Sequence, residues 1–288
     1  MISIVDLHKQ ESFALSAGQT PPVDDLKRKD KEASRIDFYM EHLERTARYF
    51  SSEIKYGLFD GFYAKLKFVN KVVDLGFEVV SKLRCGAQLK YLYEGEQKKR
   101  GRRRKFAGKV SFADLSRLEQ VAKLAGDEEH IRLYTLVVWS VSLQPEVRVV
   151  VVVNRKDEKK LRYVVLFSTD PKLSARQVFD YYKARFSIEF IFRDAKQFAG
   201  FSDCQSREKE VLDFHFNASV SSVNVARLLA QEEQQARERF VFSMSSIKQR
   251  FFNQHLLEMF IEKLELDQTA IKNHPQFESL RNYAAIAS

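Results

Sequence analysis

The segment from Tyr181 to Lys196 constrains the fold of this 288-residue chain more than any other. Read as a helix at about 100° per residue, it aligns five polar side chains within roughly 40° of one line. These five are Tyr182, Arg185, Glu189, Arg193 and Lys196. Phenylalanine and isoleucine cover the other directions. A helix that is apolar nearly all round is normally buried, so we expect a buried helix with one polar stripe.

The carboxylate on this stripe, Glu189, has two interpretations. In the first, it forms salt bridges at helical spacing with Arg185 and Arg193, so that no unpaired charge is buried. In the second, it binds a metal ion while the basic neighbours contact phosphate. The net charge of +9 and the sequence pI of about 9.3 suit a polyanionic partner. Many basic proteins bind no such partner, so charge alone does not decide between the two.

The spacing of the stripe favours the second interpretation. Tyr182, Arg185, Glu189 and Lys196 are separated by two, three and six residues. This pattern resembles the Y-(2)-R-(3)-E-(6)-K signature of the IS-four family of DDE transposases, and the resemblance extends from near the start of the chain to about residue 229. It implies that Glu189 is the third catalytic carboxylate of a ribonuclease-H-like α/β core. It also implies residues that bind transposon-end DNA: Tyr182, Arg185 and Lys196, with Arg193 as an auxiliary.

Asp60 is the second carboxylate of interest. It follows a short strand-like run and precedes a helical pattern that reaches Asp74, with Gly76 expected to close that helix. In open α/β sheets, ligands gather outside the carboxyl ends of strands. An Asp before Gly is also a common cap or turn residue. The resemblance favours the catalytic interpretation, because the family places its second Asp at such a strand end.

A dense basic run occupies residues 98–105, and strand-like runs follow it. A solvated loop is one interpretation. Closely spaced cations repel one another unless a polyanion is present, which favours DNA binding by Arg102, Arg103 and Arg104. The resemblance implies a mainly β insertion between the second and third carboxylates. We expect the single tryptophan, Trp139, to pack in the core, with base stacking as the less favoured alternative.

We therefore expect four segments. Residues 1–84 and 166–230 form the two parts of the ribonuclease-H-like core, 85–165 the β-rich insertion, and 231–288 a helical C-terminal tail. The first two strands look like the second and third of the family's three-stranded meander. The first catalytic Asp would then precede Met1, and the chain would be an N-terminally truncated transposase. Asp6 is the alternative candidate for that first carboxylate.

The resemblance implies a DNA transposase in which Asp60 and Glu189 bind Mg²⁺ or Mn²⁺, ions that prefer carboxylate oxygens. Double-stranded DNA, both transposon ends and target, would be bound by a homodimer. Loss of the first Asp would impair cleavage; an inactive remnant that binds transposon ends is the alternative. Two cysteines make neither a disulfide framework nor a zinc site, and no apolar run approaches the roughly 20 residues of a membrane span. We therefore expect a cytoplasmic, nucleoid-associated bacterial protein.

Overall fold

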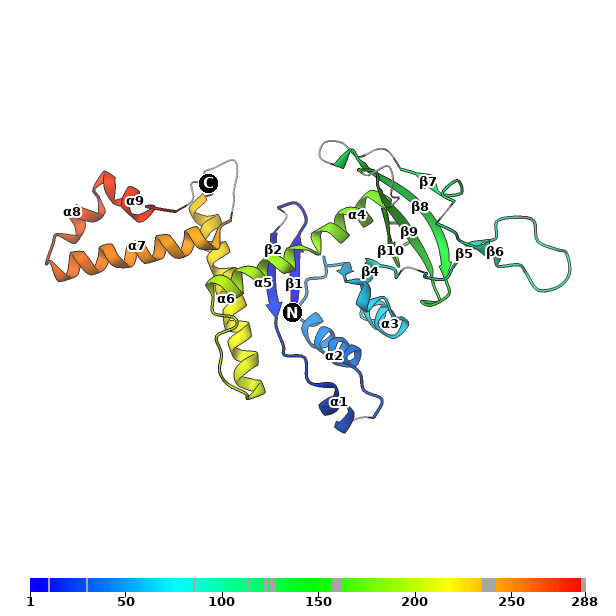
Figure 1. The fold of residues 1–288 in the computed structure, drawn as a ribbon, viewed down its shortest axis with the longest axis horizontal. Helices are drawn as coiled ribbons and strands as arrows, with labels where there is room; N and C mark the ends of the chain where they lie inside the picture. Colours follow the sequence, from blue (N-terminus) through cyan, green and yellow to red (C-terminus); the bar gives the residue numbers. More distant parts are fainter. Residues whose placement is uncertain are drawn as a thin grey trace. The chain divides into compact units, whose positions relative to one another are not determined.

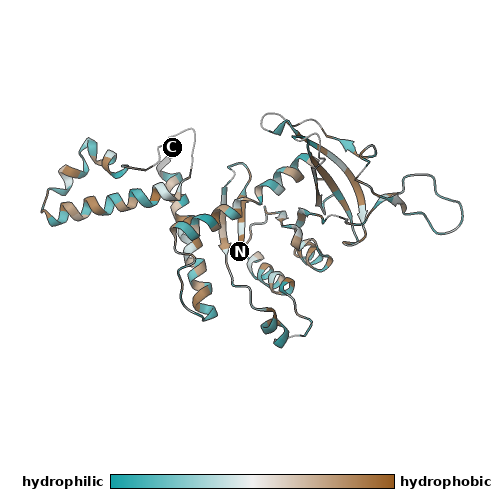
Figure 2. Ribbon diagram, viewed as in Figure 1, coloured by the Kyte–Doolittle hydropathy of each residue, from teal (hydrophilic) through white to brown (hydrophobic). Residues whose placement is uncertain are grey.

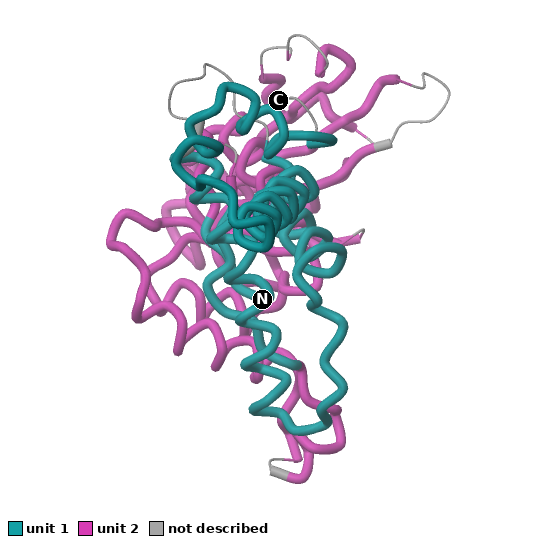
Figure 3. Tube along the Cα trace, turned by 90° about the vertical axis from the view of Figure 1, so that its left-hand side faces the viewer, with its two compact units in different colours: residues 1–4, 12–19, 187–288 teal, residues 5–11, 20–186 magenta. Residues whose placement is uncertain are grey.

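The chain divides into two compact units, coloured separately in Figure 3. The computed structural model describes residues 1–288 except 10, 30, 85, 113, 122–123, 125–127, 157–161, 235–241 and 286–288. Unit 1 comprises Met1–Ile4, Ser12–Gln19 and Ser187–Ser288, and unit 2 comprises Val5–Glu11 and Thr20–Phe186. The four segments expected from the sequence are a functional division, which these compact units do not test.

Unit 2 contains an eight-stranded mixed sheet (Figure 1). Its strands are β3 (Tyr56–Leu58), β4 (Glu78–Lys82), β5 (Leu89–Leu92), β6 (Phe106–Lys109), β7 (Glu119–Gln120), β8 (Ile131–Ser140), β9 (Glu146–Asn154) and β10 (Arg162–Ser168). The order is β3-β4-β10-β9-β8-β5-β6, with β7 paired to β8. Among the described residues of this sheet, only β3 and β4 pair in parallel, and the other pairs are antiparallel. The strands β5 to β9 lie within residues 85–165, and they belong to the same sheet as β3 and β4.

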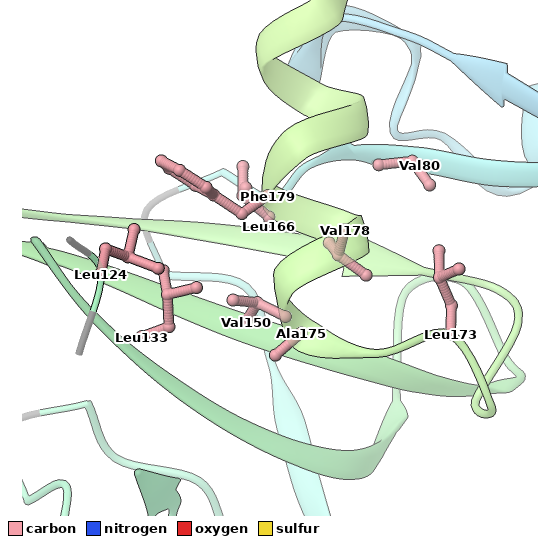
Figure 4. Packing of buried hydrophobic residues seen from close by; sticks show 9 residues of the cluster. All are labelled: Val80, Leu124, Leu133, Val150, Leu166, Leu173, Ala175, Val178 and Phe179. Atoms are coloured by element: carbon pink, nitrogen blue, oxygen red, sulfur yellow. The ribbon is translucent and has the colours of Figure 1, made fainter. Parts of the chain in front are cut away.

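The helices of unit 2 are α1 (Val23–Lys29), α2 (Arg35–Ala47), the 3₁₀ turn η1 (Gly61–Tyr63), α3 (Leu66–Asp74) and α4 (Ala175–Ala184). A capping box starts α4: Ser174 accepts from the Gln177 amide, and the Gln177 side chain accepts from the Ser174 amide. Val178 and Phe179 then pack on the sheet (Figure 4). As expected, α3 ends at Asp74 and Gly76 follows with φ +89°.

The strand β4 does not alternate between buried and exposed side chains. Val79, Val80 and Ser81 are consecutive and at most 1% exposed. Successive strand residues face opposite sides of a sheet, so both faces of β4 are covered. The polar residues of this strand therefore do not mark a solvent-exposed face.

Unit 1 is mainly helical. Its helices are α5 (Ser187–Phe198), α6 (Lys209–Gln234), α7 (Met244–Lys263), α8 (Gln268–Lys272) and α9 (Pro275–Arg281). Ile191 and Ala195 of α5 pack on Val220 and Val223 of α6. The strands β1 (Ile2–Asp6) and β2 (Glu11–Ser16) pair with each other as a separate two-stranded sheet. Across the described part of the chain, every helix is too short or too polar to cross a membrane.

Two asparagines of α6 bind the backbone of the β2 segment. Asn224 accepts from the Ala14 amide at 3.0 Å and donates to the Ala14 carbonyl at 2.7 Å. Asn217 makes the same pair of bonds with Ala17, at 2.9 and 2.7 Å. Ala14 and Ala17 are each 6% exposed. Each side-chain amide therefore satisfies the backbone N–H and C=O of one buried alanine, as a neighbouring strand would. We call this pair of asparagines the amide clasp.

The expected single helix over Tyr181–Lys196 is wrong. The helix α4 ends at Ala184, Arg185 and Phe186 form a turn, and α5 begins at Ser187. The Phe186 amide bonds to the carbonyl of Lys183, three residues back, which tightens the last turn and ends the regular helix. The expected burial is wrong as well, because Phe186 is 50% exposed.

Candidate functional site

Asp60 lies just past the C-terminal end of β3, as expected. The Phe59 amide still bonds to Val80, and Asp60 comes next with an exposed side chain. Its Oδ1 accepts from the Gly61 amide at 2.6 Å, so Asp60 also caps the turn η1. The strand-end and capping interpretations of Asp60 therefore describe the same geometry. The bond holds one carboxylate oxygen and orients the group at the end of the sheet.

Tyr182 and Arg185 lie at the C-terminal end of α4, also in unit 2. The Arg185 guanidinium is 5.5 Å from the centroid of the Tyr182 ring. Burial raises the pKa of Tyr182, the Arg185 cation lowers it, and the Asp60 carboxylate raises it. Unit 2 thus brings together two of the residues singled out from the sequence, Tyr182 and Arg185.

Glu189, Arg193 and Lys196 share the exposed face of α5, opposite the buried Ile191 and Ala195. The part of the polar stripe that falls on α5 is therefore present. Glu189 lies in the first turn of α5, so its negative charge is at the positive end of the helix dipole.

Arg193 has a partner that sequence reasoning missed. Its Nε and Nη2 donate to Oδ1 of Asp194 at 3.1 and 2.9 Å, and its guanidinium lies 5.1 Å from the Phe190 ring centroid. Asp194 is only 3% exposed, so this ion pair neutralises a buried carboxylate. Of the two arginines expected to neutralise Glu189, Arg193 pairs with a different acid.

Asp60 and Glu189 belong to different units, so the expectation that they share an ion stays a prediction. Within the described ranges, no three His, Cys, Asp or Glu side chains are grouped so that they could hold a metal ion. Asp60 and Glu189 are exposed carboxylates, the oxygen donors that suit Mg²⁺ or Mn²⁺ rather than a soft ion.

Two further acids lie at the other end of the sheet. The Tyr56 hydroxyl donates to Oδ2 of Asp170 at 2.8 Å, and the Thr169 hydroxyl donates to Glu78. Burial, followed by the bond to Asp170, raises the pKa of Tyr56 to about 12. Tyr56 begins β3, whereas Asp60 follows its end, so this network is separate from Asp60. We interpret it as structural.

The basic candidates Arg102, Arg103 and Arg104 are exposed in the loop between β5 and β6. Trp139 is half-buried and packs its ring against Phe106, with 5.7 Å between centroids. His215 has its Nε2 2.7 Å from the Gly200 carbonyl oxygen.

Asp6, the alternative first carboxylate, is a turn residue here. Its Oδ1 accepts from the amides of Lys9 at 3.1 Å and His8 at 2.9 Å, and these bonds, that from Lys9 first, lower the pKa of Asp6. A lowered pKa contributes stability above the unfolded-state pKa of about 3.9 and loses it as the pH falls.

We therefore expect Asp6→Asn to leave DNA cleavage unchanged. It should lower the free energy of unfolding slightly at pH 7, and the difference from wild type should shrink as the pH falls below about 4. Parallel cleavage assays and urea titrations at several pH values measure both effects. Abolished cleavage with unchanged stability would make Asp6 a catalytic ligand instead.

Residues 34–225 match the family model of the transposase DDE domain, and this range is two-thirds of the chain. The chain belongs to the transposase DDE domain family. The match includes Asp60 and the whole segment from Tyr182 to Lys196. No curated protein matches the chain. The family places the chain among the nuclease and transposase enzymes, with DNA as substrate and divalent metal ions in general use.

The resemblance to DDE transposases and the mixed α/β class are thereby confirmed. The assignment to the IS-four family and the ribonuclease-H-like topology stay predictions.

Proposed function

We propose that this chain is a metal-dependent transposase that cuts transposon ends and joins them to target DNA. The family match carries the proposal, because it covers both Asp60 and the Tyr-Arg-Glu-Lys spacing around Glu189. Asp60 and Glu189 hold Mg²⁺ or Mn²⁺. Double-stranded DNA is bound by a homodimer, with one copy at each transposon end, in the bacterial cytoplasm near the nucleoid.

The reaction is two successive in-line displacements at phosphorus. Water attacks the phosphodiester at the transposon end, the P–O bond to the 3′-oxygen breaks, and that oxygen leaves as a hydroxyl. The freed 3′-hydroxyl then attacks a phosphodiester of the target and displaces another 3′-oxygen. When bound, the metal ions activate the attacking oxygen and stabilise the leaving one.

The side chains prepare this chemistry in distinct ways. Asp60 is held by the Gly61 amide, so its carboxylate is oriented before the substrate arrives. The guanidinium of Arg185 and the ammonium of Lys196 neutralise phosphate, and the Tyr182 hydroxyl donates to a phosphate oxygen. Burial keeps that hydroxyl protonated, because it raises the pKa of Tyr182.

An end-binding remnant without cleavage is the second candidate. Two carboxylates are assigned to the metal, and the third candidate, Asp6, uses its Oδ1 in a turn. Removing a charged ligand weakens stabilisation of the transition state more than ground-state binding of DNA. A site with only two metal-binding carboxylates would then cleave poorly, while the basic residues still bind transposon ends.

Both candidates require the basic residues of the signature to contact phosphate. We expect Arg185→Ala and Lys196→Ala each to reduce the slope of log affinity against log salt concentration by about one unit. A variant that makes one phosphate contact fewer also releases fewer counterions when it binds DNA. Glu189→Gln should leave that slope unchanged. The measurement is a fluorescence titration of a labelled duplex at several salt concentrations.

Arg185→Lys is the matched control, because it preserves the charge and should keep most of the slope. Unchanged slopes for both alanine variants would show that Arg185 and Lys196 are structural residues, and would contradict the DNA role.

A further inference from the structure

The loop between β5 and β6, residues 93–105, is the most basic segment of the chain; we call it the basic arm. Its cations are Lys98, Lys99, Arg100, Arg102, Arg103, Arg104 and Lys105, and all are exposed. Figure 1 shows the loop projecting past β5 and β6, and Figure 2 shows it as hydrophilic along its length. No acidic residue falls between positions 98 and 105.

Arg104 has a different role from the other cations of the arm. The Gln97 side chain donates to the Arg104 carbonyl at 2.8 Å and accepts from the Arg104 amide at 2.9 Å. The Arg104 guanidinium donates to the Phe106 carbonyl at 3.1 Å and lies 4.7 Å from the Tyr93 ring centroid. These contacts close residues 98–103 into a loop. Arg104 therefore braces the arm, and the five cations of residues 98–103 form its tip.

The arm and Asp60 leave the sheet at the same end. β3 is parallel to β4, and four antiparallel pairings, through β10, β9 and β8, bring β5 back to the direction of β3. One cross-strand row joins Leu58, Val80, Ser168, Arg148 and Val137, in that order. Tyr91 of β5 pairs with the next residue of β8, Val138. Asp60 follows Leu58 by two residues, and the arm begins two residues after Tyr91.

The separation between these two features follows from the sheet. Five strand-to-strand steps separate β3 from β5. At about 4.8 Å a step they span roughly 24 Å, and the right-handed twist turns the arm outward past the sheet edge. B-DNA advances about 3.4 Å per base pair, so this span is roughly seven base pairs.

We propose that the basic arm grips the backbone of duplex DNA about seven or more base pairs from the phosphate that lies at Asp60. Lys98, Lys99, Arg100, Arg102 and Arg103 contact phosphate, and Arg104 holds the tip in shape. This inference rests on the proposed transposase function, and adds to it a second contact region on the same unit. Five neighbouring cations repel one another, and that repulsion is relieved when phosphates lie between them.

The test compares a tip variant, Arg102→Ala/Arg103→Ala, with a control that removes two exposed charges from α7, Lys248→Ala/Lys263→Ala. On a labelled 30-base-pair duplex, we expect the tip variant to shallow the log–log salt slope by about two units. The control should leave the slope unchanged. An equal change in both variants, or none in the tip variant while the wild-type chain binds, would overturn the arm without affecting the proposed function. Failure of the wild-type chain to bind duplex would overturn both.

A hairpin duplex of six base pairs, about 20 Å long, tests the position of the contact. A duplex this short at Asp60 does not reach the arm. Shortening the DNA should therefore shallow the slope of the wild-type chain by about two units more than the slope of the tip variant. Equal shortening effects would contradict a distant contact. Tighter, tip-dependent binding of single-stranded RNA of equal length would assign the arm to another partner.

The brace has its own readout. Arg104→Ala should speed amide hydrogen exchange across residues 93–105, while Arg102→Ala/Arg103→Ala should not, because only the first variant removes contacts that close the loop. Unchanged exchange in Arg104→Ala would make Arg104 one more phosphate contact and overturn its separate role.

Discussion

Asp60→Asn and Glu189→Gln are each expected to lower DNA cleavage by on the order of 10³-fold, while DNA affinity changes little. Each substitution keeps the shape of the side chain and removes the negative charge that holds a divalent ion. The ion acts on the attacking and leaving oxygens, so its loss raises the barrier for bond breaking. Binding depends on the basic residues instead, and these variants leave them in place.

The measurement is a cleavage assay on a labelled duplex that carries the flanking DNA of the element, run with Mg²⁺ and with Mn²⁺. Glu210→Gln is a matched control, because Glu210 is an exposed acid in the first turn of the neighbouring helix α6. Undiminished cleavage by Asp60→Asn or Glu189→Gln would exclude that residue from the metal site. If the wild-type chain binds the duplex with both ions and cuts with neither, the end-binding remnant is the better description.

Local signals allowed the position of Asp60 to be predicted. A short apolar run, an Asp-Gly pair and a helix closed by Gly76 are all encoded within about 20 residues, and each lies where expected. The break after Ala184 was not predictable in the same way. The residues of α4 and those of α5 both fit the helical period of about 100° per residue. The period does not reveal that two residues between these helices leave the helical conformation. The Phe186 amide donates to the Lys183 carbonyl, three residues back, and the spacing of residue types does not predict this bond.

The roles of the individual cations were the other limit. Arg102 and Arg104 look equivalent in a basic run, but only Arg104 has Gln97 and Tyr93 in contact. Likewise, Arg193 lies on the predicted stripe and pairs with the adjacent Asp194, outside the signature. Composition and spacing identify a group of basic residues. Contacts within the fold then determine which of these residues are available to bind phosphate.

The amide clasp should dominate the stability of unit 1. In Asn217→Ala or Asn224→Ala, one buried amide and one buried carbonyl of the β2 segment lose their partners. Each unsatisfied group costs about 1–3 kcal/mol, so we expect each variant to lose about 2–6 kcal/mol of unfolding free energy. The two sites are seven residues apart on α6, about 10 Å along the helix axis, so their losses should add.

Urea titration followed by circular dichroism measures these losses. Ser222→Ala is the control: it lies on the exposed surface of the same helix, and its hydroxyl bonds only to the Ala218 carbonyl within α6. It should change the unfolding free energy by less than about 0.5 kcal/mol. Asn224→Asp keeps the oxygen that accepts from Ala14, but it turns a second carboxylate oxygen toward the Ala14 carbonyl, so it should cost at least as much as Asn224→Ala. Losses below about 0.5 kcal/mol for both alanine variants would show that water replaces the clasp and that β2 is held by its apolar contacts.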